Sequence, residues 1–164
     1  MPQQQQKDPS LYLRTTEKNQ EMEETNIHKC LMIFSDGGAR GNPGPAAIAF
    51  IIQTETGQIV TTNSRFIGLC TNNQAEYQAL MAALETAAEL KTESVTCHLD
   101  SELVVKQLSG EYRIKNKELR QLWQKVQELK TQFAEVKFVN VPRTHRIIQQ
   151  ADKLVNLTLD TEQK

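Results

Sequence analysis

The segment of residues 33–45 constrains the fold of this 164-residue chain more than any other. It reads IFSDGGARGNPGP. An apolar stretch, residues 31–34, runs into Asp36, and four glycines and two prolines follow within the next nine residues. Glycine allows close approach to the backbone, and proline interrupts a strand ladder. We therefore expect Asp36 to end a buried strand, where open α/β sheets place their binding sites.

The pattern of the remaining chain predicts an α/β domain over residues 29–164, preceded by a polar tail, residues 1–28, that is disordered or loosely helical. The order of elements is βββαβααβα. Right-handed crossovers then give a five-stranded mixed sheet flanked by helices, with three antiparallel strands followed by two parallel ones. The expected strands are residues 30–35, 46–54, 58–67, 95–99 and 135–141, and the expected helices are residues 72–90, 101–108, 116–132 and 147–159.

Composition excludes several classes of protein. No apolar run approaches the roughly 20 residues that span a bilayer, so we expect no membrane segment. No signal-peptide pattern is visible, and three widely spaced cysteines argue against a disulfide framework. We expect a monomer in the reducing cytoplasm. The net charge is −1, yet residues 101–153 hold eleven basic and six acidic groups, a net of +5 that suits either a polyanionic partner or an ordinary solvated surface.

Four carboxylates fall where this fold would bring them together. Asp36 and Asp100 each follow a predicted buried strand. Glu76 falls on the sheet-facing stripe of its helix, and Asp152 lies in line with Val155 on the last helix. An acid on a core-facing stripe is costly unless it is paired or bound to a metal. Oxygen ligands of this kind suit Mg²⁺ or Mn²⁺, and two such ions about 4 Å apart serve phosphodiester displacement.

Each carboxylate also has a simpler structural interpretation. Asp36 can be a turn residue, and Asp100 can cap the helix that begins near Ser101. Glu76 and Asp152 can interact favourably with a helix dipole in the first turn. These interpretations are harder to hold for all four acids together, because like charges that converge raise one another's pKa unless a cation intervenes.

Four motifs resemble those of ribonuclease H type 1, in a compact form that lacks the basic protrusion. They are DGGARGNPGP at 36–45, TNNQAE at 71–76, DSELVV at 100–105 and AD at 151–152, and the similarity covers about residues 30–160. The resemblance implies a metal-dependent endonuclease that cuts the RNA strand of RNA–DNA hybrids and leaves 3′-hydroxyl and 5′-phosphate ends. By the same match, two Mg²⁺ ions, or Mn²⁺ in their place, are held by Asp36, Glu76, Asp100 and Asp152. One ion activates the attacking water and the other stabilises the leaving oxygen.

The resemblance also implies the substrate contacts. The 2′-hydroxyl groups that distinguish RNA from DNA are read by Gly37, Gly38, Asn72, Asn73 and Glu76. Asn42 and Thr71 form the pocket for a phosphate of the DNA strand. The structural alternatives are a turn role for Asn42 and a helix cap for Thr71.

The chain departs from the family's pattern in the loop before Asp152. The usual Asn four residues ahead of this acid is Ile148, and His145 lies closer to it than the usual loop histidine that helps release product. His145 is therefore a candidate catalytic residue beside the alternative of a solvated loop histidine. Arg143 or Arg146 is a candidate contact to the scissile phosphate.

The substrate-binding regions depart as well. Leu69 stands where a basic residue often precedes the phosphate pocket, which weakens that pocket. In place of the family's basic protrusion, the segment after the helix of residues 101–108 retains at most Tyr112, Arg113, Lys115 and Lys117. Trp123 lies on an apolar helical stripe, so we expect it in the core and not as a platform for base stacking. Two alternatives to hybrid cleavage remain open: a hybrid-binding module with weak or lost cleavage, and a related nuclease or phosphatase with another substrate.

Overall fold

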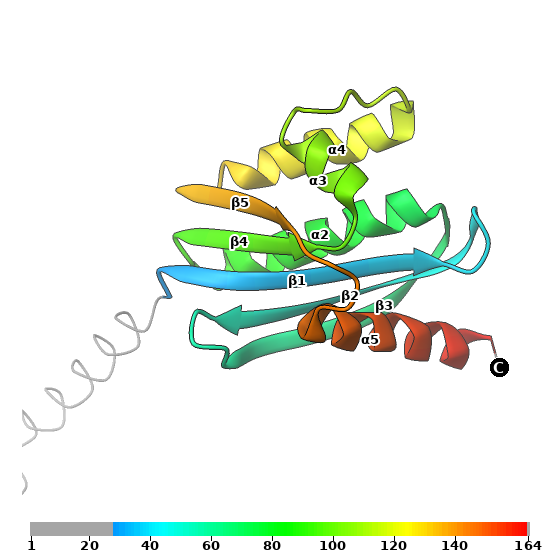
Figure 1. Cartoon of the computed structure of the whole chain (residues 1–164), viewed down its shortest axis with the longest axis horizontal. Coiled ribbons are helices and arrows are strands. Elements are labelled where there is room, and N and C mark those ends of the chain that lie inside the picture. Colours follow the sequence, from blue (N-terminus) through cyan, green and yellow to red (C-terminus); the bar gives the residue numbers. More distant parts are fainter. Residues whose placement is uncertain (1–27, 164) are drawn as a thin grey trace, which may run out of the picture.

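A computed structural model describes residues 28–163 (Figure 1). The predicted order of nine elements is confirmed within these residues, whereas the prediction for residues 1–27 lies outside them. The strands are β1 (Cys30–Ala39), β2 (Gly44–Thr54), β3 (Ile59–Cys70), β4 (Ser94–Leu99) and β5 (Glu135–Asn140). The helices are α2 (Asn72–Glu89), α3 (Glu102–Leu108), α4 (Lys117–Lys130) and α5 (Arg146–Glu162).

The five strands form one mixed sheet in the order β3-β2-β1-β4-β5. β1, β2 and β3 pair antiparallel, as their short connections require, and β4 and β5 run parallel to β1. This topology is the predicted one. It places the carboxyl end of β4 beside the middle of β1, at the centre of the sheet (Figure 1).

β1 is longer than expected, and this corrects the position of Asp36. The ladder with β4 stops at Phe34 and His98, but the ladder with β2 continues to Ala39, so that Asp36 pairs with Ala49 inside the strand. Asp36 is therefore neither a strand end nor a turn residue. The glycines that follow it remain extended because they lie against β2, and the turn comes later, around Gly41.

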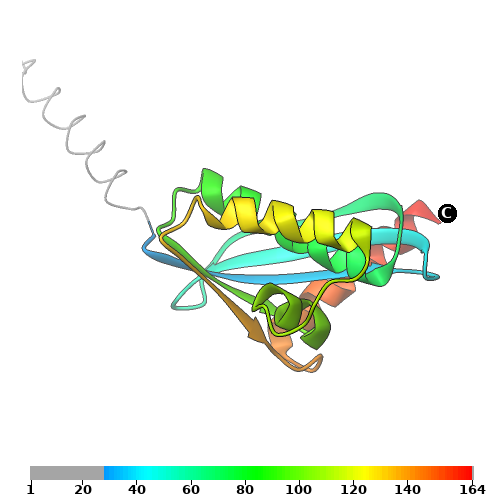
Figure 2. The same ribbon diagram turned by 90° about the horizontal axis from the view of Figure 1, so that it is seen from above.

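The helices cover both faces of the sheet (Figures 1 and 2). α2 packs on β1 and β2, with α4 alongside it, and its alanine-rich buried face permits this close approach. α5 crosses the opposite face of β1, β2 and β3 and buries Ile148, Val155 and Leu159. Apolar cores therefore lie on both faces of the sheet. Asp36, Glu76 and Asp100 meet just beyond the last pair of the β1–β4 ladder, which is Phe34 and His98.

The stripe predicted for α4 is confirmed in part. Leu119 and Val126 are buried, but Trp123 is only partly buried, packing against the core and also lining a surface pocket. The connection between α3 and α4 is short, as expected. Cys30, Cys70 and Cys97 are free thiols. No helix within residues 28–163 is both long and apolar enough to cross a bilayer.

Candidate active site

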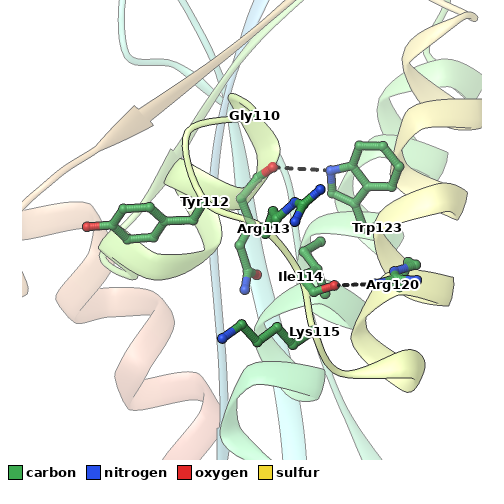
Figure 3. Close-up of a pocket in the computed structure, with 8 residues that line it drawn as sticks. Gly110, Tyr112, Arg113, Ile114, Lys115, Arg120 and Trp123 are labelled. Carbon is green, nitrogen blue, oxygen red and sulfur yellow. Dashed lines mark hydrogen bonds between the residues drawn. The ribbon is translucent and has the colours of Figure 1, made fainter.

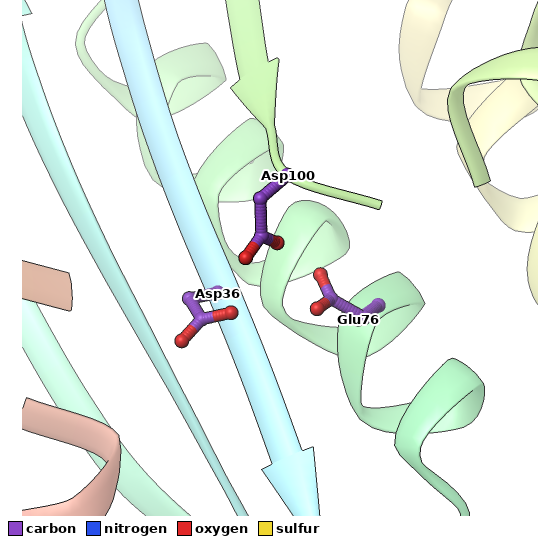
Figure 4. A group of neighbouring side chains, drawn as sticks. All are labelled: Asp36, Glu76 and Asp100. Carbon is purple, nitrogen blue, oxygen red and sulfur yellow. The ribbon is translucent and has the colours of Figure 1, made fainter. Parts of the chain in front are cut away.

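Three carboxylates converge between β1, β4 and α2. Asp36, Glu76 and Asp100 each offer an oxygen, and these oxygens lie within 4.8 Å of one another (Figure 4). One carboxylate oxygen of Glu76, Oε2, is buried and has no hydrogen-bond partner among the described residues. A buried, unpaired anionic oxygen is costly. The donor set consists of oxygens only and fits a hard divalent cation such as Mg²⁺ or Mn²⁺.

The electrostatics of this cluster are unfavourable without a cation. Burial, together with the charges of Asp100 and Asp152, raises the pKa of Asp36 from 3.8 to about 7. Burial and the charge of Asp36 raise the pKa of Glu76 well above its ordinary value, and burial raises the pKa of Asp100. Because burial and the neighbouring carboxylates raise the pKa of both Asp36 and Glu76, the site without a cation favours one bound proton on this pair near neutral pH. A divalent cation would release that proton and stabilise the charged forms.

Asp152 reaches the site from α5, but not in the way its helical position suggests. The stripe that includes Val155 was expected to bury it; instead Asp152 is exposed, because Ala151 and Val155 occupy the sheet-facing positions. Asp152 still lines the same cavity, and its charge raises the pKa of both Asp36 and Asp100. It lies outside the tight group of three and forms the open rim of the cavity.

The other structural interpretations of these acids are wrong. Ser101, not Asp100, is the N-cap of α3, and its hydroxyl accepts from the Val104 N–H at 3.3 Å. α2 begins at Asn72 and has no acid in its first turn, so Glu76 lies beyond the strong part of the dipole. Neither residue is placed by helix capping.

The cavity around these acids measures 390 Å³ and is mainly polar. Most of the predicted site residues line it, and Ser101 is the one lining residue that was not predicted, although it directly follows Asp100. The lining residues are Asp36, Gly37, Gly38, Asn72, Asn73, Glu76, Asp100, Ser101, Arg143 and Asp152. Asn42, Thr71 and His145 lie outside it.

Gly37 is required by packing. A Cβ at this position would lie 2.3 Å from both the backbone carbon and the oxygen of Ala75, because β1 passes directly over the first turn of α2. This approach brings the backbone of Gly37 and Gly38 beside Asn72 and Asn73 at the cavity wall. The glycines thus allow strand and helix to build one surface.

The loop between β1 and β2 is fastened to the N-terminus of α2 by side-chain hydrogen bonds. The Asn72 N–H donates to Asn42 Oδ1 at 3.0 Å, and the Ala39 N–H donates to Asn72 Oδ1 at 2.8 Å. Thr71 is the N-cap of α2 in a capping box with Gln74. The helix-cap interpretation of Thr71 is therefore confirmed. Its hydroxyl proton and the amide protons of Asn42 have no acceptor within the described residues, so both side chains keep a donor for a ligand.

The loop before α5 carries Arg143 and His145, whereas Arg146, the alternative to Arg143, is the first residue of α5 and does not line the cavity. Arg143 is 91% exposed and its Nε lies 3.7 Å from Asp100 Oδ2, so its side chain can reach a ligand in the cavity. His145 is half-buried, not a solvated loop residue: its ring stacks on Phe34 with centroids 5.3 Å apart. His145 Nδ1 also accepts from the Ile147 N–H at 3.2 Å and caps α5.

His98 has the packing role expected for a strand histidine. Its ring donates to the Ile33 carbonyl at 3.0 Å and stacks on Phe34 with centroids 4.3 Å apart. Burial lowers its pKa. Phe34 thus stacks on both His98 and His145, and these contacts support β1 and β4 two residues before Asp36 and Asp100.

Comparison with known proteins agrees with this geometry. The sequence profile of a family described as reverse transcriptase-like matches residues 34–158. A curated ribonuclease HI of Halobacterium salinarum is 42% identical over 127 residues, which are 77% of this chain and 63% of that protein. This chain therefore spans just under two thirds of that relative's length.

Solved structures extend the likeness to the whole fold. The crystal structure of RNase H1 from Halobacterium salinarum superposes with a TM-score of 0.77 at 40% identity, covering 80% of this chain and 98% of that one. LC11-RNase H1, solved in complex with an RNA/DNA hybrid, gives a TM-score of 0.77 at 37% identity, covering 82% and 99%. The domain is of the ribonuclease H-like class. At this identity and coverage, the chain belongs to the ribonuclease H type 1 family.

Proposed function

We propose that this domain is a metal-dependent endonuclease that hydrolyses the RNA strand of RNA–DNA hybrids and leaves 3′-hydroxyl and 5′-phosphate ends. The observation that carries the proposal is the buried group of three carboxylates whose oxygens lie within 4.8 Å, one of them unpaired. The complex of the relative LC11-RNase H1 with an RNA/DNA hybrid supports the substrate class.

Asp36, Glu76, Asp100 and Asp152 would hold two Mg²⁺ ions, with Mn²⁺ as a substitute. Bound divalent ions would supply an activated water and charge stabilisation at the leaving oxygen. Asp36 is central to the group, because the charges of both Asp100 and Asp152 raise its pKa. Asp152, on the open rim, is the acid nearest to solvent and therefore the one most easily reached by an incoming substrate.

The polar wall of the cavity supports a preference for RNA over DNA in the strand that is cut. Asn72, Asn73 and the backbone of Gly37 and Gly38 lie beside Glu76, where a 2′-hydroxyl can both donate and accept. A DNA strand in the same place would leave these groups unpaired. Loss of such hydrogen bonds is costly in a site built to make them.

The outer residues would bind phosphate. Asn42 and Thr71 use their oxygens as acceptors at the start of α2, so their donor groups would hold a phosphate of the DNA strand. Arg143, exposed beside Asp100, would contact the scissile phosphate. His145 would assist product release only if its ring left the cap of α5. The monomeric state and cytoplasmic location stay predictions of the sequence.

A second candidate function is a hybrid-binding module with weak cleavage. Leu69, beside the proposed phosphate pocket, is 79% exposed and carries no charge, and Asp152 stands outside the tight carboxylate group. Both observations favour slower turnover than in a site with four closely packed acids. The same assay separates the two functions, because a binding module would hold hybrids without metal-stimulated cleavage.

The test is a cleavage panel with end analysis. A hybrid labelled on the RNA strand is incubated with Mg²⁺ or Mn²⁺ beside double-stranded RNA and double-stranded DNA. We expect cleavage of the hybrid's RNA strand alone, with products that ligate through a 5′-phosphate. Absence of cleavage with either metal would refute the proposal.

A matched pair of variants on α5 sharpens the panel. Asp152→Asn removes a cavity acid, whereas Asp160→Asn removes an exposed acid that pairs with Arg40 far from the cavity. We expect Asp152→Asn to lower the cleavage rate by about 100-fold or more, since transition-state charge stabilisation by bound metal is worth several kcal/mol. Asp160→Asn should cleave at the rate of the unchanged protein.

A further inference from the structure

A second pocket opens between α4 and the segment that joins it to α3 (Figure 3). It measures 490 Å³, within the range of small-molecule sites, and shares no residue with the acidic cavity. Its floor is apolar, formed by Trp123 and Ile114. Three cations, Arg113, Lys115 and Arg120, surround it, and none of its lining residues is acidic.

The pocket is built, not incidental. The Trp123 indole N–H donates to the Gln107 carbonyl at 3.2 Å, which fixes the ring where it lines the pocket. Arg120 donates to the Ile114 carbonyl at 2.7 Å and holds the connecting segment against α4. The side chain of Arg113 reaches toward the indole, whereas Tyr112 points away from it (Figure 3).

Two nearby acids are paired with other residues, and Glu111, between Gly110 and Tyr112, does not line the pocket. Glu118, at the start of α4, accepts a hydrogen bond from Gln74 on α2. Glu102 pairs with Lys106 at 2.8 Å, and Lys106 lies over the ring of Tyr112. An indole face with unpaired cations and no carboxylate favours a planar group that carries negative charge.

We propose that this pocket binds an unpaired nucleotide, with its base against Trp123 and its phosphate against Arg113 and Lys115. Stacking of a base on an aromatic side chain is tolerant of sequence and is worth roughly 1–3 kcal/mol. A base inside a duplex has both faces covered by its neighbours and cannot offer one to the indole. The occupant is therefore a free nucleotide or a single-stranded end of a nucleic acid.

The position of the pocket favours the single-stranded end of a nucleic acid as its occupant. α3 begins two residues after Asp100, and Gln107 near its end lines the pocket. Seven helical residues span about 10 Å. A strand that leaves the acidic cavity along α3 would thus place an unpaired nucleotide in the pocket within a few nucleotides. The proposal does not depend on cleavage, since the pocket lies outside the carboxylate group.

The chain offers a direct reporter, because Trp123 is its only tryptophan. The whole protein is titrated in EDTA with adenosine monophosphate, with a six-nucleotide thymidine oligonucleotide, with ribose 5-phosphate and with a blunt RNA–DNA hybrid. We expect saturable quenching by the mononucleotide or the oligonucleotide, weakened by salt, and little effect of ribose 5-phosphate. Quenching by the mononucleotide alone indicates a soluble ligand, and stronger quenching by the oligonucleotide indicates a strand end.

Matched variants complete the test. Arg113→Gln combined with Lys115→Gln removes two exposed cations and should weaken oligonucleotide binding by about tenfold or more. Lys125→Gln, an exposed cation on α4 outside this pocket, should leave it unchanged. The proposal is overturned if neither the mononucleotide nor the oligonucleotide quenches Trp123 fluorescence, or if the blunt hybrid alone does. It is also overturned if the double variant binds the oligonucleotide as well as the unchanged protein. A protein that quenches but cuts no hybrid would contradict only the proposed function.

Discussion

Replacing Asp36 by Asn should stabilise the metal-free protein, and the gain should grow with pH. The pKa of Asp36 rises from 3.8 to about 7 in the folded state, chiefly through burial. A raised carboxyl pKa means that the folded state keeps a proton that the unfolded chain releases, so stability falls as pH rises from about 4 to 7. The difference of about three pKa units corresponds to at most about 4 kcal/mol above pH 7.

The asparagine side chain in the Asp36→Asn variant would keep the useful contacts and lose the charge. The amide has the shape of the carboxylate, and its NH₂ group can donate to the neighbouring Glu76 carboxylate. We therefore expect equal stability of Asp36→Asn and the unchanged protein at pH 4. At pH 8 we expect the variant to be more stable by about 1–4 kcal/mol, or roughly 2–4 °C in Tm per kcal/mol.

The assay is chemical or thermal unfolding in EDTA across pH 4–8. Glu89→Gln, an exposed acid at the end of α2, is the control and should track the unchanged protein at every pH. Added Mg²⁺ should then stabilise the unchanged protein more than the variant, which lacks one ligand. Equal stability of Asp36→Asn and the unchanged protein at pH 8 would refute the argument from charge crowding.

Three further predictions follow from the geometry. Gly37→Ala should lower the free energy of unfolding by about 3 kcal/mol, because its Cβ would lie 2.3 Å from the Ala75 backbone; an unchanged denaturation midpoint would contradict that packing. Leu69→Arg should tighten binding of an RNA–DNA hybrid in EDTA, and the slope of log K against log salt concentration should steepen by about one unit. Equal affinity of the variant and the unchanged protein would place the DNA strand elsewhere. Arg40→Ala breaks an ion pair with Asp160 in which the two side chains are 33% and 61% exposed. The free energy of unfolding should therefore fall by less than about 1 kcal/mol, and a fall of more than about 2 kcal/mol would contradict this.

Much of the fold follows from local pattern. The alanine-rich segment of α2 and the apolar stripe of α4 have the period of helices, and the β-branched stretches between turn residues have the length of strands. Topology then follows from the connections, because short links give antiparallel pairs and helical crossovers give parallel ones. The order of nine elements was accordingly predictable.

The conformation after Asp36 and the exposure of Asp152 and Trp123 could not be predicted, because they depend on how neighbouring elements pack against one another. Glycine after Asp36 suggested a turn, but pairing with β2 holds Gly37 and Gly38 extended. The helical period aligned Asp152 with Val155, yet Ala151 takes the buried position, so a rotation of α5 about its axis decides exposure. Trp123 fits an apolar stripe, and only the short connection before α4 leaves one side of it open.

The proposed chemistry requires that one pocket of carboxylates binds divalent cations. Crystals grown with Mn²⁺ and measured for anomalous scattering test it most directly. We expect anomalous peaks among Asp36, Glu76 and Asp100, with Asp152 drawn toward them, and loss of a peak in crystals of Glu76→Gln. Mn²⁺ bound elsewhere, with these carboxylates empty at a saturating concentration, would contradict it.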